Sequence, residues 1–473
     1  MHRPGYSRVL WDARRIRRDG RAGIDRRQRQ RLREIVAYAR AHSAYYRQIY
    51  RDVPESISAI GQLPVVTKAE LMGQFDGWVT DPAVTRARVE EFLADPGNVG
   101  RDFLGRYVVC TTSGATGIPA ILLHDHFALA VYNVLGYARS LPVALLSPRK
   151  VWELLRGRGR MAAVFVTGGH FLANTMMARR IRKVPWRGRM QRIFSAMAPV
   201  AELVADLNDF QPVILGGYPS ALVTLACEQR AGRLRIHPMM ISAAGESLPA
   251  AKRRLISAAF GCRVGNYYGT SEAVGLTYQC AADRLHVNSD WYILEPVDEH
   301  NRPVPAGQLS DGVLVTNLAN RIQPIIRYQL GDRVTVDPEP CPCGSPFPSI
   351  EVVGRTDDTL VFATPEGTEV RILPLAIATV AEETPGVAGC QLIQRAPTIL
   401  TVRLRVEQPD DEHAVWAALR ERLAFFLSAQ GVTTATIERA DEPPAPHPRS
   451  GKFRQVYSEV AHTERSKTKG MRY

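Results

Sequence analysis

The chain has 473 residues, of which 45% are hydrophobic and 23% charged, and its formal net charge is +13. This length exceeds one ordinary hydrophobic core, so at least two domains are expected. No apolar run reaches the roughly 20 residues that cross a bilayer, and the seven cysteines are too scattered for a disulfide framework. These features favour a cytoplasmic globular protein with no membrane partner. The arginines are spread along the chain, apart from a cluster between Arg14 and Arg33, and no nucleic-acid motif occurs, so a nucleic-acid partner is not expected.

The first 60 residues predict a basic helical arm packed on a large domain. Leu32, Ile35, Val36 and Ala39 fall at helical spacing and would form its buried stripe. Further on, Thr67-Lys68-Ala69-Glu70 has the spacing of a capping box, so a helix should begin there.

The next part of the chain repeats one pattern, an apolar strand followed by a polar, glycine-rich turn and a helix. The strands are expected at Tyr107–Cys110, Met161–Val166, Val213–Leu215, Met239–Ser242 and around Val264. This pattern predicts an α/β large N-terminal domain with parallel-rich sheets, over residues 61–355. Because ligands bind beyond the carboxyl ends of parallel strands, the polar turns should gather at one edge.

Shorter strands from about Asp290 predict a β-rich subdomain within the large domain. A break at Gly354-Arg355-Thr356-Asp357-Asp358 precedes strands near Leu360 and at Ile399–Val406, and a helix from about Asp411 to Ala429. We therefore expect a small α+β C-terminal domain over residues 356–473.

The strand at Tyr107–Cys110 leads into a loop of hydroxyls and glycines, namely Thr112, Ser113, Gly114, Ala115, Thr116 and Gly117. Glycines allow backbone N–H groups to approach an anion closely, and the hydroxyls add donors. The loop lacks the Gly-Lys-Ser/Thr ending of a P-loop. It predicts a phosphate-binding site of another type.

Five short motifs follow one another in order. They are Thr111–Gly117, Tyr268-Gly269-Thr270-Ser271-Glu272, Tyr328-Gln329-Leu330-Gly331-Asp332-Arg333, Gly354–Asp358 and Ser450-Gly451-Lys452. This ordered set resembles the adenylate-forming superfamily of acyl-CoA synthetases, adenylation domains and luciferases. The segments Ala41–Arg47 and Leu63–Lys68 resemble the phenylacetate–CoA ligase family and its relatives in capsule and natural-product gene clusters.

The resemblance implies that a carboxylic acid reacts with ATP to give an acyl-adenylate and pyrophosphate, and the expected acid is an aryl or arylacetic acid. It implies that Glu272 binds Mg²⁺ and that Asp332 binds the ribose. Thr270 is a further candidate catalytic residue. The remaining candidate nucleotide contacts are Ala243, Ala244, Gly245, Glu246, Asn266, Tyr267, Tyr268, Gly269, Ser271 and Arg355, and the candidate acid pocket comprises His170, Phe171, Gly216, Gly217, Tyr218 and Pro219.

The resemblance also implies a mobile C-terminal domain that closes over the large one. Its Lys452 would stabilise charge that develops on the carboxylate and the α-phosphate, and Asp357 would be the hinge. Purely structural roles stay open for several of these residues. Glu272 could cap a helix, Asp332 could close a turn, Lys452 could be a solvated loop residue, and His170 could be a hydrogen-bonded core histidine.

Cys341-Pro342-Cys343 is a Cys-x-Cys sequence, and Cys280 and His286 lie in the loop after the Glu272 motif. In a cytoplasmic protein, cysteines at such short spacing bind a metal more often than they form disulfides. These four residues predict a structural Cys₃His zinc site.

The acceptor of the acyl group is less constrained. Residues 364–374 replace the segment that shapes the pantetheine channel in thioester-forming relatives. Coenzyme A is the first candidate, and an amine or a carrier-protein thiol is the alternative. A non-catalytic binding protein of the same fold and a homodimer are further possibilities.

Overall fold

The computed structural model describes residues 6–112, 120–140, 152, 154, 156–157, 159–246, 248, 250–352, 360–363, 369–372, 374–445 and 455–460. The candidate residues Ser113–Gly117, Arg355, Asp357 and Lys452 lie outside these ranges. Contacts divide the chain into two compact units. The large unit comprises the described residues within 6–112, 120–195 and 204–352. The small unit comprises the described residues within 196–203 and 360–460.

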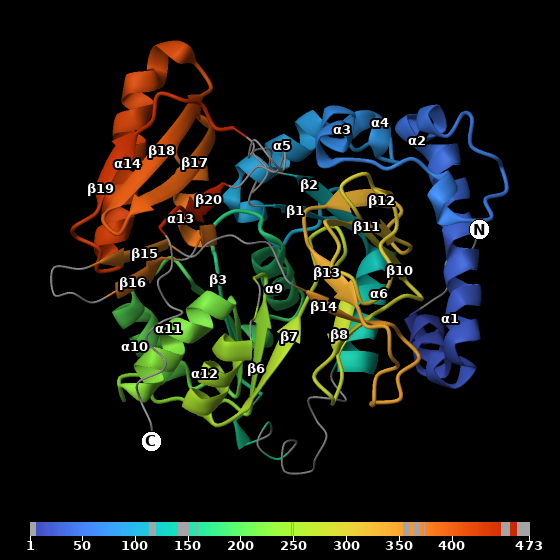
Figure 1. The fold of residues 1–473 in the computed structure, drawn as a ribbon, viewed down its shortest axis with the longest axis horizontal. Coiled ribbons are helices and arrows are strands. Elements are labelled where there is room, and N and C mark those ends of the chain that lie inside the picture. Colours follow the sequence, from blue (N-terminus) through green and yellow to red (C-terminus); the bar gives the residue numbers. More distant parts are fainter. Residues whose placement is uncertain are drawn as a thin grey trace. The chain divides into compact units, whose positions relative to one another are not determined.

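The N-terminal helix α1 (Tyr6–His42; Figure 1) bends back on itself at Gly20, whose φ is 62° and ψ is −164°. Asp12 lies 2.6 Å from Arg27, although a straight helix would separate these two residues by about 22 Å. Asp12 also pairs with Arg31. The two halves of α1 are therefore antiparallel neighbours, joined by partly buried ion pairs. We call them the N-terminal hairpin.

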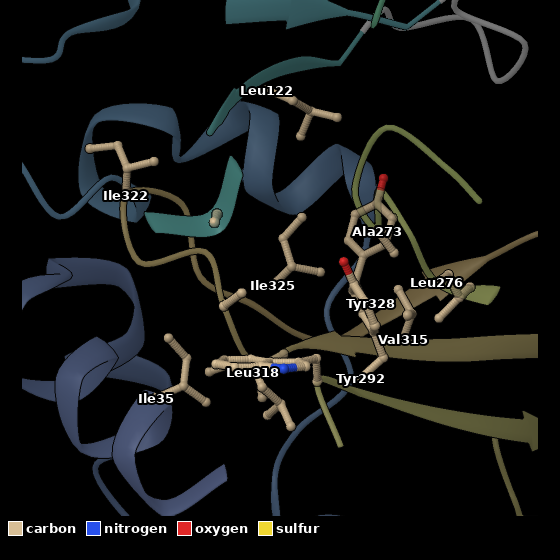
Figure 2. Packing of buried hydrophobic residues seen from close by; sticks show 14 of the residues in the cluster. Ile35, Leu122, Ala273, Leu276, Tyr292, Val315, Leu318, Ile322, Ile325 and Tyr328 are labelled. Atoms are coloured by element: carbon tan, nitrogen blue, oxygen red, sulfur yellow. The ribbon is translucent and has the colours of Figure 1, made fainter. Parts of the chain in front are cut away.

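Apolar side chains of the N-terminal hairpin belong to the main core of the large unit. Val9, Leu32 and Ile35 are buried in one cluster with residues from the later strands, and Figure 2 shows Ile35 in this cluster with Leu318 and Ile325. The short helices α2 (Ala44–Ile49), α3 (Lys68–Gly73), α4 (Phe75–Trp78) and α5 (Arg86–Ala94) follow.

The capping box predicted at the start of α3 is confirmed. The Thr67 hydroxyl accepts a hydrogen bond from the Glu70 N–H, and the Glu70 carboxylate accepts one from the Thr67 N–H at 2.7 Å.

The large unit contains a five-stranded parallel sheet with the strand order β4-β3-β5-β6-β7; three of its strands are labelled in Figure 1. Its strands are β3 (Met161–Phe165), β4 (Gln191–Ser195), β5 (Ile214–Gly217), β6 (Met240–Ala244) and β7 (Arg263–Tyr267), and the connecting helices are α9 (Leu172–Lys183), α10 (Val200–Phe210), α11 (Pro219–Arg230) and α12 (Ala250–Phe260). The chain runs from β3 outward to β4 and then returns to β5 on the other side of β3. The strand order thus reverses between β3 and β5, which is where open α/β sheets bind ligands.

The predicted α/β architecture is confirmed, but the expectation of several parallel-rich sheets is wrong. Within the described residues, β4-β3-β5-β6-β7 is the only parallel sheet of the large unit. β1 (Tyr107–Thr111) pairs antiparallel with β2 (Ile121–Asp125) because the short connection between them cannot make the crossover that parallel strands need. After β2 come α6 (His126–Leu135) and a π-helical turn over Gly136–Ser140.

The later part of the large unit contains two antiparallel sheets. One has the order β10-β11-β12, formed by Tyr292–Val297, Gly312–Asn317 and Ile325–Leu330; the other has the order β13-β14-β9-β8, formed by Val334–Val336, Ser349–Val352, Leu285–Val287 and Thr277–Gln279. The predicted β-rich part of the large domain therefore corresponds to these two sheets.

The small unit is an α+β structure. It contains the hairpin β15 (Leu360–Ala363) and β16 (Glu369–Ile372), the sheet β19-β18-β17-β20 (Thr436–Arg439, Ile399–Val406, Val387–Ala396 and Val456–Ser458), and the helices α13 (Pro374–Glu382) and α14 (Glu412–Ala429). Its mobility stays a prediction. No helix in the described ranges has the length and hydropathy to cross a bilayer.

The β1–β2 hairpin buries a histidine, His124, which is 1% exposed. Its Nε2 lies 3.7 Å from the Cys110 Sγ, and its Nδ1 lies 3.4 Å from the Tyr132 hydroxyl. Burial lowers the pKa of His124 to about 4, and the charge of Asp125 and the backbone of Ser271 offset part of this effect. The ring is therefore neutral in the folded protein at neutral pH.

We expect this histidine to make the protein sensitive to acid. The unfolded chain takes up the His124 proton near pH 6.5, and the folded chain takes it up only near pH 4. The free energy of unfolding is therefore at its full value above pH 6.5 and decreases as the pH falls toward 4. The total decrease from this one group is about 3 kcal/mol. Urea unfolding at pH 7 and pH 4.5 measures this loss. It should be clearly smaller in His124→Gln and unchanged in His300→Gln, which alters an exposed side chain. Equal losses in all three proteins would show that His124 does not cause the acid sensitivity.

A second prediction concerns Gly245, which follows β6 with φ +85°. A Cβ at this position would lie 2.8 Å from Cε1 of Tyr218. Gly232 has a similar φ of +73° but open space around it, which makes it a matched control. Both Gly→Ala changes should cost about 1–2 kcal/mol for the left-handed backbone, and Gly245→Ala about 1–3 kcal/mol more for the clash. Equal losses of unfolding free energy in urea would contradict the tight contact with Tyr218.

Candidate active site

Two motifs that lie far apart in the sequence are joined by a pair of tyrosine–carboxylate hydrogen bonds. The Tyr268 hydroxyl donates to Oδ2 of Asp332 at 3.0 Å. In the opposite direction, the Tyr328 hydroxyl donates to Oε1 of Glu272 at 3.0 Å. Glu272 is 7% exposed and Asp332 is 8% exposed. The structure thus brings together the two carboxylates that the resemblance assigns to Mg²⁺ and ribose, and we call this arrangement the reciprocal pair.

The turn over residues 270–276, the Glu272 turn, is held by buried polar side chains from β10 and β11 and from Asn288, which follows β9. The Asn317 Nδ2 donates to the Glu272 carbonyl at 3.0 Å, and the Asn288 Nδ2 donates to the Gly275 carbonyl at 2.6 Å. The Tyr292 hydroxyl donates to the carbonyl of Val274. Within the turn, the Ala273 N–H donates to the Thr270 Oγ1 at 3.2 Å. The position of Glu272 is therefore fixed from outside its own motif.

The end of β1 is anchored on both sides. The Thr111 N–H donates to the His170 carbonyl at 2.9 Å, and Thr111 bridges to Phe171 in parallel fashion. The Thr112 N–H donates to the Ala120 carbonyl at 3.0 Å, and the Ala120 N–H donates to the Thr112 Oγ1 at 2.9 Å. The entry to the candidate phosphate loop therefore lies beside the turn that follows β3.

The candidate acid-pocket residues follow β3 and β5, the two strands between which the strand order reverses. His170 and Phe171 come after β3, and Tyr218 and Pro219 come after Gly216 and Gly217 at the end of β5. A Cβ on Gly217 would lie 3.1 Å from the Val164 carbonyl oxygen, so these two strands approach closely. The Tyr218 ring packs edge-on against Phe165, with centroids 4.8 Å apart.

His170 is buried, with 3% of its surface exposed, and neither ring nitrogen makes a hydrogen bond of normal geometry to any residue that the structure describes. Burial lowers its pKa, and the backbone of Asp95 offsets part of that effect. The role of His170 in the acid pocket therefore stays a prediction, and so does the alternative of a core histidine bonded to the Asp95 backbone.

The candidate nucleotide residues after β6 divide into two groups. Ala243 and Ala244 end the strand, and Gly245 lies against the Tyr218 ring. The Glu246 carboxylate instead accepts hydrogen bonds from the N–H and the hydroxyl of Ser220, at 3.1 and 2.5 Å, at the start of α11. These bonds give Glu246 a helix-capping role.

At the end of β7 and directly after it, the candidate residues lie against the strand that returns from the Glu272 turn. The Asn266 N–H donates to the Gln279 Oε1 at 2.9 Å, and the Gly275 N–H donates to the Tyr267 hydroxyl at 2.6 Å. Burial raises the pKa of Tyr267 to about 12. Gly269 stands directly over the Tyr267 ring, since a Cβ there would lie 3.0 Å from its hydroxyl oxygen.

Cys280, His286, Cys341 and Cys343 converge on one point, with their ligand atoms all within 4.8 Å of one another. The Cys280 and Cys341 sulfurs are 3.7 Å apart, and the Cys343 sulfur is 3.4 Å from the His286 Nε2. A tetrahedral zinc with bonds of about 2.3 Å to sulfur and 2.0 Å to nitrogen requires similar separations. The His286 Nδ1 is 2.8 Å from the Phe347 carbonyl, which leaves Nε2 for a metal. We call these four residues the Cys₃His cluster.

Sequence reasoning missed the residues that hold the site. Asn288, Tyr292 and Asn317 support the Glu272 turn, and His124 lies beneath it near the Ser271 backbone. Single asparagines and tyrosines in strands carry no periodic signal. Tyr328 is the exception, because it lies within one of the five motifs.

No family model matches the sequence. The protein CapK of Staphylococcus aureus is 24% identical over 351 residues, which cover 70% of this chain and 68% of CapK. A solved structure of 2-hydroxyisobutyryl-CoA ligase with 2-HIB-AMP and CoA, in the thioesterification state, is 21% identical, with a TM-score of 0.58 and coverage of 92% of this chain and 90% of that one. The same ligase with 2-HIB-AMP in the postadenylation state is 20% identical, with a TM-score of 0.52 and coverage of 91% and 89%. The resemblance predicted from the motifs is confirmed at the level of the fold: this chain has the fold of the adenylate-forming ligases.

Proposed function

We propose that the protein activates a carboxylic acid with ATP and then transfers the acyl group to a thiol. In the first step a carboxylate oxygen bonds to the α-phosphorus while the bond to pyrophosphate breaks, which gives the acyl-adenylate. The observation that carries this proposal is the reciprocal pair, because it places a candidate metal ligand and a candidate ribose ligand in one buried arrangement.

The two carboxylates suit different parts of a nucleotide. Glu272 would hold Mg²⁺, a hard cation that prefers carboxylate and phosphate oxygens and would neutralise phosphate charge. Asp332 has two oxygens that can accept from both ribose hydroxyls. Tyr268 holds Asp332 in place through one hydrogen bond and, with Ala243–Gly245, would bound the adenine.

The acid is proposed to bind at the reversal of the parallel sheet. Its wall there would be formed by His170, Phe171 and Tyr218, with Gly216 and Gly217 leaving room for a flat ring. The aromatic side chains favour an aryl or arylacetic acid. Neither ring nitrogen of His170 has a partner of normal geometry among the described residues, which supports a polar contact with a ligand at this point.

The C-terminal lysine would supply the positive charge for the first step. By the resemblance, Lys452 would stabilise the charge that develops on the transferring oxygens, Arg355 would lie near the ribose and phosphate, and Asp357 would be the hinge. Ser113–Gly117 would hold the β- and γ-phosphates.

Coenzyme A is the proposed acceptor, with an amine or a carrier-protein thiol as the alternative. The fold shared with 2-hydroxyisobutyryl-CoA ligase, which was solved with 2-HIB-AMP and CoA, supports an acyl-adenylate followed by a thiol acceptor.

The first test is acid-dependent exchange of labelled pyrophosphate into ATP, measured with a panel of aryl and arylacetic acids. We expect exchange in the wild type, a fall of about a hundredfold in Lys452→Ala, and no change in Lys183→Ala, an exposed lysine that pairs with Asp102. Exchange that is absent with every acid, or unaffected by Lys452→Ala, would refute the proposal. Adding coenzyme A, amines or a carrier protein then separates the acceptors.

We further propose that the Cys₃His cluster holds a structural zinc, since four protein ligands leave no open position. Protein purified without chelator should contain about one zinc per chain, as measured by elemental analysis. Cys343→Ser should lower that content, whereas Cys227→Ser, at an exposed cysteine outside the cluster, should leave it unchanged. A zinc content near zero in the wild type would contradict this proposal.

A further inference from the structure

Two aromatic residues, Tyr278 and Phe347, contact the histidine of the Cys₃His cluster. The Tyr278 ring stacks on His286 with centroids 5.2 Å apart and planes 22° apart. The same ring meets Phe347 edge-on at 5.9 Å. The Phe347 carbonyl accepts the hydrogen bond from His286 Nδ1. The Tyr278 ring and the Phe347 backbone therefore both contact this histidine.

On its other side, Phe347 contacts a buried arginine. The Arg139 guanidinium carbon lies 4.4 Å from the centre of the Phe347 ring, and Arg139 is 1% exposed. Its two terminal nitrogens each lie 2.8 Å from an oxygen of Asp290, and Nη1 also donates to the Asn288 Oδ1 at 2.6 Å. A planar guanidinium that is stacked and doubly paired has little freedom to move alone.

Asn288 completes the connection to the Glu272 turn. The side chain that accepts from Arg139 through its oxygen donates through its nitrogen to the Gly275 carbonyl at 2.6 Å. A continuous series of contacts thus runs from His286 through Phe347, Arg139 and Asn288 to Gly275, three residues beyond Glu272.

The N-terminal hairpin closes this region from outside. Ile16 and Ile24 are both 0% exposed and form, with Tyr278 and Phe347, a hydrophobic cluster of their own. Arg31 of the same hairpin pairs with Asp290. Because close-packed interiors leave no room for a ring to shift alone, a displacement at Phe347 must move its neighbours.

We propose that Arg139 is a positioning residue that couples metal binding at the Cys₃His cluster to the placement of Glu272. With metal bound, His286 is fixed, Phe347 is held under Arg139, and Asn288 holds the Gly275 carbonyl. Without metal, the histidine is released and the stack over Phe347 loosens. The role of Glu272 in this statement rests on the proposed function, but the coupling between the cluster and the turn does not.

The coupling is tested by hydrogen exchange on the full-length protein, loaded with zinc or stripped of it by a chelator. The Ala273, Gly275 and Leu276 amides all have acceptors in or beside the Glu272 turn and report on its order. In the wild type, zinc removal should speed their exchange about tenfold. Phe347→Leu keeps the Arg139–Asp290 pair. In this variant, exchange should already be fast in the zinc-loaded protein, and zinc removal should change its rate less than twofold.

Two further variants separate this coupling from general loosening. Arg139→Lys keeps a charge beside Asp290 but loses the planar stack, and it should behave like Phe347→Leu. Phe194→Leu makes the same truncation at a buried ring in β4 and should behave like the wild type. Equal effects of zinc removal in the wild type and Phe347→Leu overturn the proposal, as does no effect in the wild type. An Arg139→Lys protein that retains the full effect overturns the assignment to Arg139.

A kinetic readout addresses the catalytic consequence. In pyrophosphate exchange, the Mg²⁺ concentration for half-maximal rate should rise about tenfold in zinc-loaded Phe347→Leu, with a smaller change in the maximal rate. A purely structural defect lowers the amount of active protein and leaves the Mg²⁺ dependence unchanged, which would overturn the link to Glu272. If no acid supports exchange at all, the proposed function fails, and hydrogen exchange still decides the coupling.

Discussion

Two carboxylates are buried in this protein beside hydroxyl groups that come from each other's chain segment. A buried carboxylate is costly unless hydrogen bonds replace its water, and a bond from a neutral donor to an ionised acceptor is among the stronger ones. Tyr268 and Glu272 belong to one segment, and Tyr328 and Asp332 to the other. Each segment therefore completes the burial of the other's carboxylate, and the Glu272 turn depends on its contact with β12.

A residue beside this arrangement, Arg327, has a strained backbone conformation. Arg327, next to Tyr328, has a φ of 49°, in the left-handed region that non-glycine residues seldom adopt. Its guanidinium pairs with both oxygens of Glu295 and donates to the Leu63 carbonyl at 2.7 Å. Such strain persists where neighbouring contacts over-determine the backbone, as at sites that must hold a side chain in one direction.

The sequence could predict the features that depend on local chemistry. The capping box at Thr67, most strands of the parallel sheet and the convergence of Cys280, His286, Cys341 and Cys343 follow from residue type and spacing. Edge strand β4 was missed because Gln191–Ser195 is polar and has only Phe194 fully buried. The bend at Gly20 was missed because an isolated glycine also occurs inside straight helices. The supporting asparagines were missed because an inward and an outward polar residue look the same in sequence.

The two hydrogen bonds between Thr112 and Ala120 also have a consequence for engineering. Three of the four groups that form these bonds belong to the backbone, and the fourth is the Thr112 hydroxyl. The described pairing of β1 with β2, from Tyr107 opposite Asp125 to Thr111 opposite Ile121, ends directly before these backbone anchors. Loops of equal length from other members of the fold could be transplanted between these anchors while the underlying hairpin keeps its pairing.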